Sequence, residues 1–386
     1  MSEWKKVNLG DCCEITSSKR IFFSEYVESG IPFYRSKEII EKGKGEEISH
    51  PLYISKEKYD EIKGKYGVPQ KGDLLLTAVG SLGIPFVVKD DLPFYFKDGN
   101  LVWLKHFQDI DPIFLYYWIK SENGYNALYN IAIGSAQKAL TIAAIKGYEI
   151  PLPPLQTQHR IATILSRYDS LIENYQKQIK LLEEAAQRLY KEWFVDLRFP
   201  GHENTKIVDG VPEGWTPSQL GQLAEFKRGK TITKKDVIDG NIPVVAGGLE
   251  PAYYCNKSNT AERVITISGS GANAGFTRMY FEKVWASDCS FVDVSVTPFL
   301  HFVYCYLKDN KTTIDNMQKG AAQPHVYAKD INSLGLCIPI ESILKSFEGK
   351  ISKYFDSISS LQSQLRLLTE ARNRLLPKLM SGEIEI

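Results

Sequence analysis

The chain has 386 residues, 43% of them hydrophobic and 24% charged, and a formal net charge of +1. This composition is that of a globular protein, and the length suggests two or three domains of ~100–200 residues each. No segment is apolar for long enough to span a membrane, so we expect a soluble chain, and cysteines without a paired framework predict reduced thiols and a cytoplasmic location. The six cysteines lack C-x-x-C spacing, which predicts neither disulfide bonds nor a zinc site. Because the net charge is near zero, a polyanionic partner must be bound through local positive clusters.

The sequence repeats itself in two halves. The stretch 4–10 (WKKVNLG) is matched by 215–221 (WTPSQLG), and 31–33 (IPF) is matched by 242–244 (IPV) at the same offset. Later, 135–137 (SAQ) is matched by 321–323 (AAQ), and 150–151 (IP) by 338–339 (IP). We therefore expect two similar units that share their ends and differ in their middles.

The globular part of each half has mixed α/β character. Residues 73–77 and 263–267 are typical of buried strands, and each runs into a glycine-rich turn, at 80–83 and 269–275. Residues 112–118 and 298–304 are predicted to be helices that begin with proline. We assign their aromatic side chains to the core rather than to ligand stacking.

Each half ends in a long helix whose apolar residues alternate at spacings of four and three, the pattern of a coiled-coil seam; an ordinary amphipathic bundle helix is the alternative. Arg372 interrupts the second seam, and Pro377 is expected to end or kink that helix. The first seam consists of Ile161, Leu165, Tyr168, Ile172, Tyr175, Ile179, Leu182, Ala186, Leu189 and Trp193. The second consists of Leu344, Phe347, Ile351, Tyr354, Ile358, Leu361, Leu365, Leu368, Leu375 and Leu379.

The length of the linker predicts the relative direction of these helices. The first seam is ~48 Å long, whereas the linker at 199–212 spans at most ~50 Å when fully extended. A parallel pair would need this linker to run taut along the whole helix, so we predict an antiparallel pair. The expected fold is two similar α/β domains (1–156 and 200–340, the second with its linker) joined by two antiparallel coiled-coil helices (157–199 and 341–386) with pseudo-two-fold symmetry.

Motifs for catalysis are weak. The loop at 269–275 has one residue too many for a dinucleotide-binding fingerprint, and no P-loop is present. The E-x-K at 61–63 lies in a run of charged residues, and the LPPL at 152–155 lacks the polar and aromatic residues that hold a flipped base. The histidines have no metal-ligand spacing. We therefore predict a protein that is not an enzyme by itself and binds no metal; an enzyme with a degenerate active site is the alternative.

Clusters of basic and amide side chains recur at matched places in both halves. Residues 227–235 (KRGKTITKK) hold five positive charges, and 17–20 (SSKR) is their counterpart. Arginine, lysine, glutamine and asparagine suit base edges, while lysine and glycine backbone amides suit phosphates. The candidate DNA-binding residues are Lys19, Arg20, Arg35, Lys37, Ser81, Gln137, Lys138, Lys227, Arg228, Lys230, Lys234, Ser270, Asn273, Gln323 and His325.

The sequence resembles the specificity subunits of type I restriction-modification systems over essentially its whole length. The resemblance is carried by 4–11 (WKKVNLGD), by the step at 134–137 (GSAQ) that leads to 150–155 (IPLPPL), by 193–199 (WFVDLRF) and by 374–379 (RLLPKL). One departure is that Thr157 and Gln158 replace the usual glutamate-glutamine pair after the prolines.

The resemblance implies two target-recognition domains that read the two halves of a split double-stranded DNA sequence, with the helices as a spacer. It also implies two methyltransferase subunits and restriction subunits as partners, which would carry S-adenosylmethionine, Mg²⁺ and ATP; the chain itself would hold no cofactor. Tyr168 and Tyr175 suggest that partner helices complete the bundle. A two-headed protein scaffold without DNA recognition remains the alternative.

Overall fold

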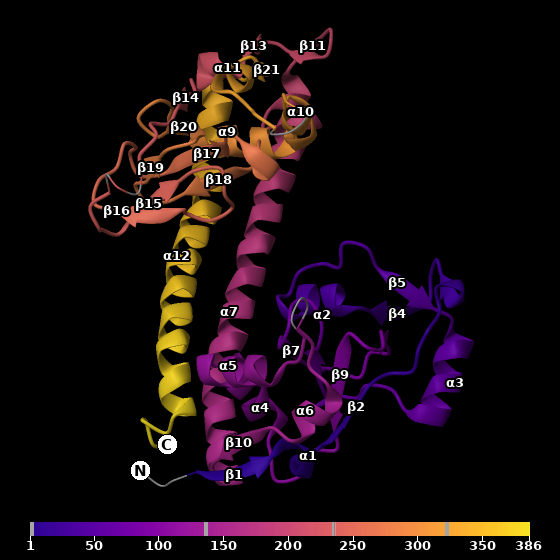
Figure 1. Cartoon of the computed structure of the whole chain (residues 1–386). Helices are drawn as coiled ribbons and strands as arrows, with labels where there is room; N and C mark the ends of the chain where they lie inside the picture. Colours follow the sequence, from indigo (N-terminus) through magenta and orange to yellow (C-terminus); the bar gives the residue numbers. More distant parts are fainter. Residues whose placement is uncertain (1–3, 135–137, 234, 236, 321–323) are drawn as a thin grey trace. The chain divides into compact units, whose positions relative to one another are not determined.

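The computed structural model describes residues 4–134, 138–233, 235, 237–320 and 324–386 (Figure 1). The chain divides into two compact units. Unit 1 consists of residues 1–174 and 365–386, and unit 2 of residues 175–364. Each unit therefore contains one α/β domain together with a part of both long helices.

Two four-stranded sheets form the centre of the α/β domain in unit 1. Both are antiparallel except for one parallel pair, β4 with β8. The first sheet has the order β2 (Glu14–Thr16), β9 (Leu101–Lys105), β6 (Leu74–Thr77), β7 (Pro85–Val87). The second has the order β3 (Tyr26–Val27), β5 (Leu52–Ile54), β4 (Ile31–Tyr34), β8 (Tyr95–Phe96). All four residues of β6 are buried, as the apolar run in the sequence predicts.

Short helices and a two-stranded ribbon complete unit 1. The ribbon pairs the first strand of the domain, β1 (Lys5–Asn8), with its last, β10 (Glu149–Leu152), so both ends of the domain lie together. The helices are α1 (Leu9–Cys12), α2 (Ser36–Gly43), α3 (Lys56–Tyr66), α4 (Pro112–Lys120), α5 (Glu122–Ile131) and α6 (Ile142–Lys146).

Unit 2 repeats this topology. Its sheets have the orders β14 (Lys227–Arg228), β20 (Cys289–Asp293), β17 (Val264–Ser268), β18 (Thr277–Tyr280) and β16 (Tyr253–Cys255), β15 (Ile242–Val245), β19 (Trp285–Ala286). The closing ribbon pairs β13 (Thr216–Gln219) with β21 (Gly335–Ile338), and a hairpin, β11 (Ile207–Val208) with β12 (Val211–Pro212), precedes it. The helices are α8 (Leu220–Leu223), α9 (Leu300–Asp309), α10 (Lys311–Asn316) and α11 (Ala328–Asn332).

The units differ most in their middles, as the sequence predicts. Unit 1 carries α2 and α3 between β4 and β6. The corresponding segment of unit 2, residues 246–263, is described throughout and contains β16 but no helix.

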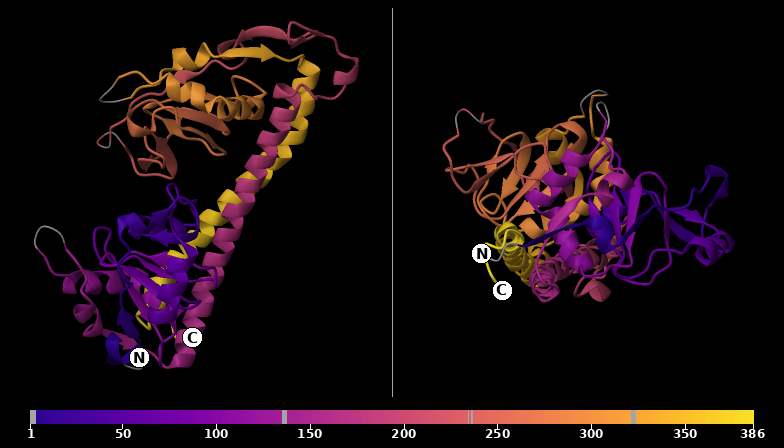
Figure 2. Two further views of the ribbon diagram at one scale, coloured as in Figure 1. Left: turned by 90° about the vertical axis from the view of Figure 1, so that its right-hand side faces the viewer. Right: turned by 60° about the horizontal axis from the view of Figure 1, so that its bottom comes forward.

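The two long helices are α7 (Leu155–Tyr190), which continues into a π-helical turn (Lys191–Val195), and α12 (Glu341–Met380). In each unit they run side by side (Figure 2). In unit 1 the start of α7 packs with the end of α12, since Leu165 and Leu379 share one core. In unit 2 the end of α7 packs with the start of α12, where the rings of Trp193 and Phe347 lie 5.6 Å apart. The predicted antiparallel direction is thereby confirmed within each unit.

The predicted seams follow the sides of the helices that are turned away from solvent. Every seam residue is buried or half-buried. Arg372 fits on its seam because it meets a carboxylate: its Nη1 lies 2.6 Å from Asp169 Oδ1 on α7. The hydroxyl of Tyr117 on α4 donates to the other oxygen of Asp169 at 2.8 Å. This network joins the domain of unit 1 to both helices.

One expected helix end and one expected helix start lie elsewhere than at the proline. Pro377 is inside α12, which continues to Met380, so of the two alternatives for this proline the helix end is excluded. The helix expected from Pro298 begins only at Leu300. In α4, by contrast, Pro112 is the first helical residue, because the Asp111 carboxylate before it accepts hydrogen bonds from two backbone N–H groups of the first turn.

Among the described residues, no helix combines the length and the apolar character that crossing a bilayer requires. Likewise, the described histidines, cysteines and acidic residues form no group that could hold a metal ion.

Tyr306 allows a test of the unit 2 core. Its hydroxyl donates to the Gly335 carbonyl at 2.6 Å, and burial raises its pKa to about 12. In the unfolded chain the phenol ionises at ~10. Between these pH values the unfolded state holds fewer protons than the folded state, so this residue makes the free energy of unfolding fall as pH rises.

We expect Tyr306→Phe to make that fall shallower by about 1.4 kcal/mol per pH unit, measured by urea unfolding at several pH values. Tyr254→Phe, which removes the hydroxyl of an exposed tyrosine, provides the matched control. Equal slopes for wild type and Tyr306→Phe would contradict the prediction.

Candidate nucleic-acid interface

A turn after the buried strand β6 is held in place by three backbone hydrogen bonds in unit 1. The Gly83 N–H closes the turn on the Thr77 carbonyl at 2.8 Å. The Ala78 N–H donates to the Asn100 carbonyl at 2.8 Å, and the Ala78 carbonyl accepts from the Leu140 N–H at 2.9 Å. The turn is therefore fixed between the start of β9 and the segment that follows the 134–137 step.

Unit 2 has the same three bonds around the turn after β17. The Gly275 N–H donates to the Ser268 carbonyl at 2.9 Å, the Gly269 N–H to the Asp288 carbonyl at 3.2 Å, and the Val326 N–H to the Gly269 carbonyl at 3.1 Å. The two turns are thus equivalent, and Asp288 stands where unit 1 has an asparagine.

Polar side chains gather around the turn of unit 2; we call Arg228, Ser270, Asp288, His325 and Tyr327 the unit 2 cluster. The Ser270 hydroxyl donates to Asp288 Oδ2, and Asp288 Oδ1 lies 3.7 Å from Nη2 of Arg228. The His325 ring stacks on Tyr327 with centroids 6.0 Å apart. Arg228, Asp288, His325 and Tyr327 line a recess of about 30 Å³, which has room for little more than a water molecule.

The basic motif at 227–230 forms the edge strand next to this cluster. Lys227, Arg228 and Lys230 are exposed, and β14 pairs with β20. Gly229 is required there, because a Cβ atom would lie only 2.4 Å from the Ser287 carbonyl oxygen. The backbone of the motif is also tied down by the Trp285 indole N–H, which donates to the Lys230 carbonyl at 2.7 Å. The positive side chains therefore project from a rigid backbone.

Unit 1 presents a different group of side chains beside its turn. Tyr125 and Tyr129 on α5 stack with ring centroids 6.2 Å apart, and each is more than 40% exposed. The Lys138 ammonium lies 3.7 Å above the Tyr129 ring, and Ser81 is exposed in the turn. We call these four residues the unit 1 cluster. Stacked aromatic rings next to a cation suit contact with nucleic acid.

A family model described as the type I restriction modification DNA specificity domain matches residues 1–184 and 212–370. The chain belongs to this family. It is 28% identical over 341 residues to the type I restriction enzyme MjaIX specificity subunit of Methanocaldococcus jannaschii, over 82% of this chain and 78% of that protein. It is 34% identical over 189 residues to a putative type I restriction enzyme specificity subunit, S.HindORF215P, of Haemophilus influenzae, over 48% of this chain and 46% of that protein.

The same fold occurs in a solved structure, that of the S subunit of a type I restriction-modification system from M. genitalium. The TM-score is 0.66 with 18% sequence identity, over 97% of this chain and 96% of that chain. The topology described above is therefore that of a chain with two DNA specificity domains.

The structure brings some of the predicted DNA-binding residues together and leaves others apart. Arg228, Ser270 and His325 meet in the second specificity domain, and Lys227 and Lys230 flank Arg228. Asn273 is used within the domain, since its amide lies 3.4 Å from the Gly247 carbonyl. Gln137, Lys234 and Gln323 lie outside the described residues.

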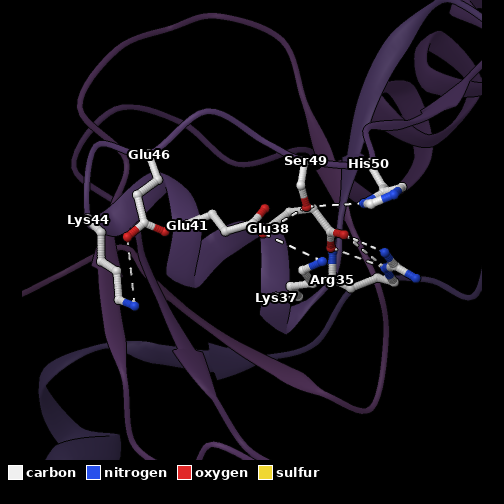
Figure 3. A network of polar contacts seen from close by, with 8 residues as sticks. All are labelled: Arg35, Lys37, Glu38, Glu41, Lys44, Glu46, Ser49 and His50. Carbon is white, nitrogen blue, oxygen red and sulfur yellow. Dashed lines mark hydrogen bonds and ion pairs between the residues drawn. The ribbon is translucent and has the colours of Figure 1, made fainter. Parts of the chain in front are cut away.

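In the first specificity domain, four predicted DNA-binding residues do not belong to the unit 1 cluster: Lys19 and Arg20, and Arg35 and Lys37. The Lys19 ammonium is 4.7 Å above the ring of Tyr66, and Arg20 Nε is 3.0 Å from Asp98 Oδ2. Arg35 and Lys37 lie at the start of α2, within a network of charged side chains (Figure 3).

Within that network, Arg35 binds the buried carboxylate of Glu38. The Arg35 backbone N–H donates to Glu38 Oε2 at 2.8 Å, and Nε lies 3.1 Å from the same oxygen. Burial raises the pKa of Glu38, but the hydrogen bonds from Arg35 outweigh it and hold that pKa below its ordinary value. Lys37 is more exposed and lies 3.6 Å from Glu41.

Sequence reasoning missed Asp288, Tyr125, Tyr129 and Tyr327. Tyr125 and Tyr129 are four residues apart on one helix, and this spacing is a signal that could have been used. Asp288 has no comparable local signal, because only the fold brings it next to Ser270 and Arg228.

Arg35 and Lys37 form a matched pair for a stability test. Arg35→Ala leaves the buried Glu38 carboxylate without its guanidinium partner, which we expect to cost about 1–3 kcal/mol. Lys37→Ala removes an exposed charge, which should change the stability by less than about 0.5 kcal/mol. Urea unfolding of both variants measures the difference, and equal losses would show that the Arg35–Glu38 contact does not stabilise α2.

Proposed function

We propose that this chain is the DNA-recognition subunit of a type I restriction-modification complex, with each specificity domain reading one half of a split target. The observation that carries this proposal is the repeated turn. Both domains hold it with the same backbone hydrogen bonds, but they surround it with different side chains. One scaffold used twice with unlike contact residues is suited to reading two unlike half-sites.

The two clusters differ in chemistry. The unit 1 cluster offers stacked tyrosine rings and an ammonium group, whereas the unit 2 cluster offers a guanidinium, a carboxylate and an imidazole. Guanidinium and carboxylate groups discriminate between base edges, while aromatic faces accept any base. The two half-sites would accordingly be read by different means.

The long helices would act as the spacer between the half-sites. The helix α7 is continuous for 36 residues, or ~54 Å at 1.5 Å per residue. A paired helix of this length resists bending, so the distance between the two readers would be set by the number of residues in the helices.

Catalysis would reside in other subunits. We propose two methyltransferase subunits and restriction subunits as partners, which would supply S-adenosylmethionine, Mg²⁺ and ATP, while this chain supplies no catalytic residue. The net charge of +1 supports this division, because the partners would then add phosphate contacts to those of the local positive clusters of this chain. A cytoplasmic location accords with the six unpaired cysteines.

The exposed lysines Lys227 and Lys230 test DNA contact by the second domain. In the complex with the methyltransferase subunits, replacing both by glutamine should weaken binding to duplex DNA and lower the slope of log K against log salt by about 0.9 for each lost phosphate contact. Fluorescence anisotropy over a salt series measures this slope.

The matched control is Lys345→Gln, which removes an exposed lysine of α12. It should leave the slope unchanged. If the double variant and the control bind DNA with the slope of the wild type, these lysines do not contact phosphates. If no form of the complex binds DNA, the chain acts as a protein scaffold instead.

The spacer role predicts the result of shortening both helices. Deleting residues 171–177 and 362–368 removes one heptad from each, ~10 Å or the rise of about three base pairs. Seven residues are close to two helical turns, so the deletion would rotate one domain about the helix axis by only ~20° relative to the other.

Methylome sequencing of cells that carry the shortened chain should show both half-sites unchanged and the spacer between them reduced. The matched control deletes four residues, 170–173, from α7 alone, which breaks the pairing of the two seams. An unchanged spacer in the heptad variant, or altered half-site bases, would refute the proposed role of the helices in setting the spacing.

A further inference from the structure

We infer that Arg228 and Asp288 together read one G·C base pair in the major groove, with the guanidinium on guanine and the carboxylate on cytosine. The inference rests on the proposed function and specifies one position of the target of the second domain.

A carboxylate on a DNA-binding surface needs a reason, because the phosphates repel it. The Asp288 side chain is 39% exposed, and it lies next to the basic edge strand β14. Its Oδ2 is engaged by the Ser270 hydroxyl, which fixes the orientation of the carboxylate. The other oxygen, Oδ1, is the one near Arg228 and is available to accept a hydrogen bond from a base.

The Arg228 guanidinium is close to this carboxylate but makes no hydrogen bond with it. Nη2 and Oδ1 are 3.7 Å apart, beyond the normal hydrogen-bond range, and the side chain is 70% exposed. Arg35 in the other domain shows the contrast, because its guanidinium is bound by a buried carboxylate. The donor groups of Arg228 can therefore turn to a partner outside the protein.

Both side chains start from fixed backbone. Arg228 pairs with Ser290 in the β14–β20 ladder, and the next residue, Gly229, donates its N–H to the Cys289 carbonyl at 2.8 Å. Asp288 immediately precedes β20, and its own carbonyl accepts from the Gly269 N–H. Only side-chain rotation is needed to place donor and acceptor side by side.

This pattern is the complement of one base pair. In the major groove guanine presents two acceptors, O6 and N7, and its partner cytosine presents the N4 amino donor next to them. A bidentate guanidinium suits the first and a carboxylate suits the second. The recess that the two side chains line, about 30 Å³, is too small for a flipped base, so an edge of a stacked pair is the fitting ligand.

The first domain has no arginine–aspartate pair at the positions that correspond to Arg228 and Asp288. Thr16 is the last residue of the β2–β9 pairing, and continuing that register by one residue places Ser17 where the second domain has Arg228. The shared backbone bond places Asn100 where the second domain has Asp288. The Ser17 hydroxyl donates to the Leu101 carbonyl at 3.2 Å. The G·C contact therefore belongs to one half-site alone, and the other half-site serves as an internal control.

The test is methylome sequencing, with binding selection from a random duplex library, of the complex containing wild type, Asp288→Ala, Arg228→Lys or the control Glu282→Gln. Glu282 is an exposed carboxylate of the same unit, and its neutralisation matches the charge change at Asp288. Both Asp288→Ala and Arg228→Lys should relax the same single G·C position by about ten- to a hundredfold. All other positions of both half-sites should keep their preferences, and Arg228→Lys should keep the salt slope.

Thermal melting identifies any variant that fails to fold, and the lysine variant, which keeps the charge, tests the geometry independently of Asp288→Ala. The inference is overturned if the wild-type motif has no G·C position that both variants relax, or if the relaxation spreads into the other half-site. A wild-type complex without any sequence preference would instead overturn the proposed function itself.

Discussion

The structure depends on the antiparallel contact between α7 and α12. Neither helix could cover its apolar side alone, and the largest hydrophobic core of each unit includes residues of both helices. In unit 1, Ile161, Leu165 and Leu379 belong to the same core as the buried strand β6. In unit 2, Trp193, Phe347 and Ile351 belong to the core that includes β17. Each domain is thus folded onto a helix pair made from distant parts of the chain, and its orientation on that pair is fixed by packing.

This constraint separates the parts that the two units share from the parts in which they differ. The ribbons β1–β10 and β13–β21 lead directly into the helices, so their positions are set by the seam contacts. The segments between the central strands differ more between the units, and one of them holds α2 and α3 in unit 1 only. The turns after β6 and β17 combine both properties, because backbone hydrogen bonds hold the main chain in place while side chains of the turn are exposed. A reader built this way can change its base contacts without disturbing the scaffold.

The parts of the fold that could be predicted from the sequence are those encoded by local periodicity. The 4-3 spacing of the seams predicts which side of each long helix is buried, and the apolar runs predict that β6 and β17 are buried. Both predictions need only the residues of the segment itself. Helix boundaries were harder to predict. Pro112 starts its helix because Asp111 caps it, whereas Pro298 precedes a helix that begins two residues later, although both prolines stand at the start of a similar apolar, aromatic-rich run. Tertiary packing decides between such alternatives.

The candidate site could be predicted only in part, for a related reason. Basic residues stand out in a sequence of low net charge, so Arg228 and its flanking lysines were found. A single aspartate does not stand out, although Asp288 determines what Arg228 can do. Its position depends on the register between β14 and β20 and on the turn after β17, neither of which leaves a short-range signal.

The same register argument explains how two domains of one topology can have unlike specificities. Equivalent ladders put Ser17 and Arg228, and likewise Asn100 and Asp288, at equivalent points of the two scaffolds. A serine committed to a backbone carbonyl cannot act as a bidentate donor, and an amide offers a donor as well as an acceptor where a carboxylate offers acceptors alone. Two substitutions at fixed backbone positions therefore suffice to change which base edge is complemented, while every strand and helix that supports them stays the same.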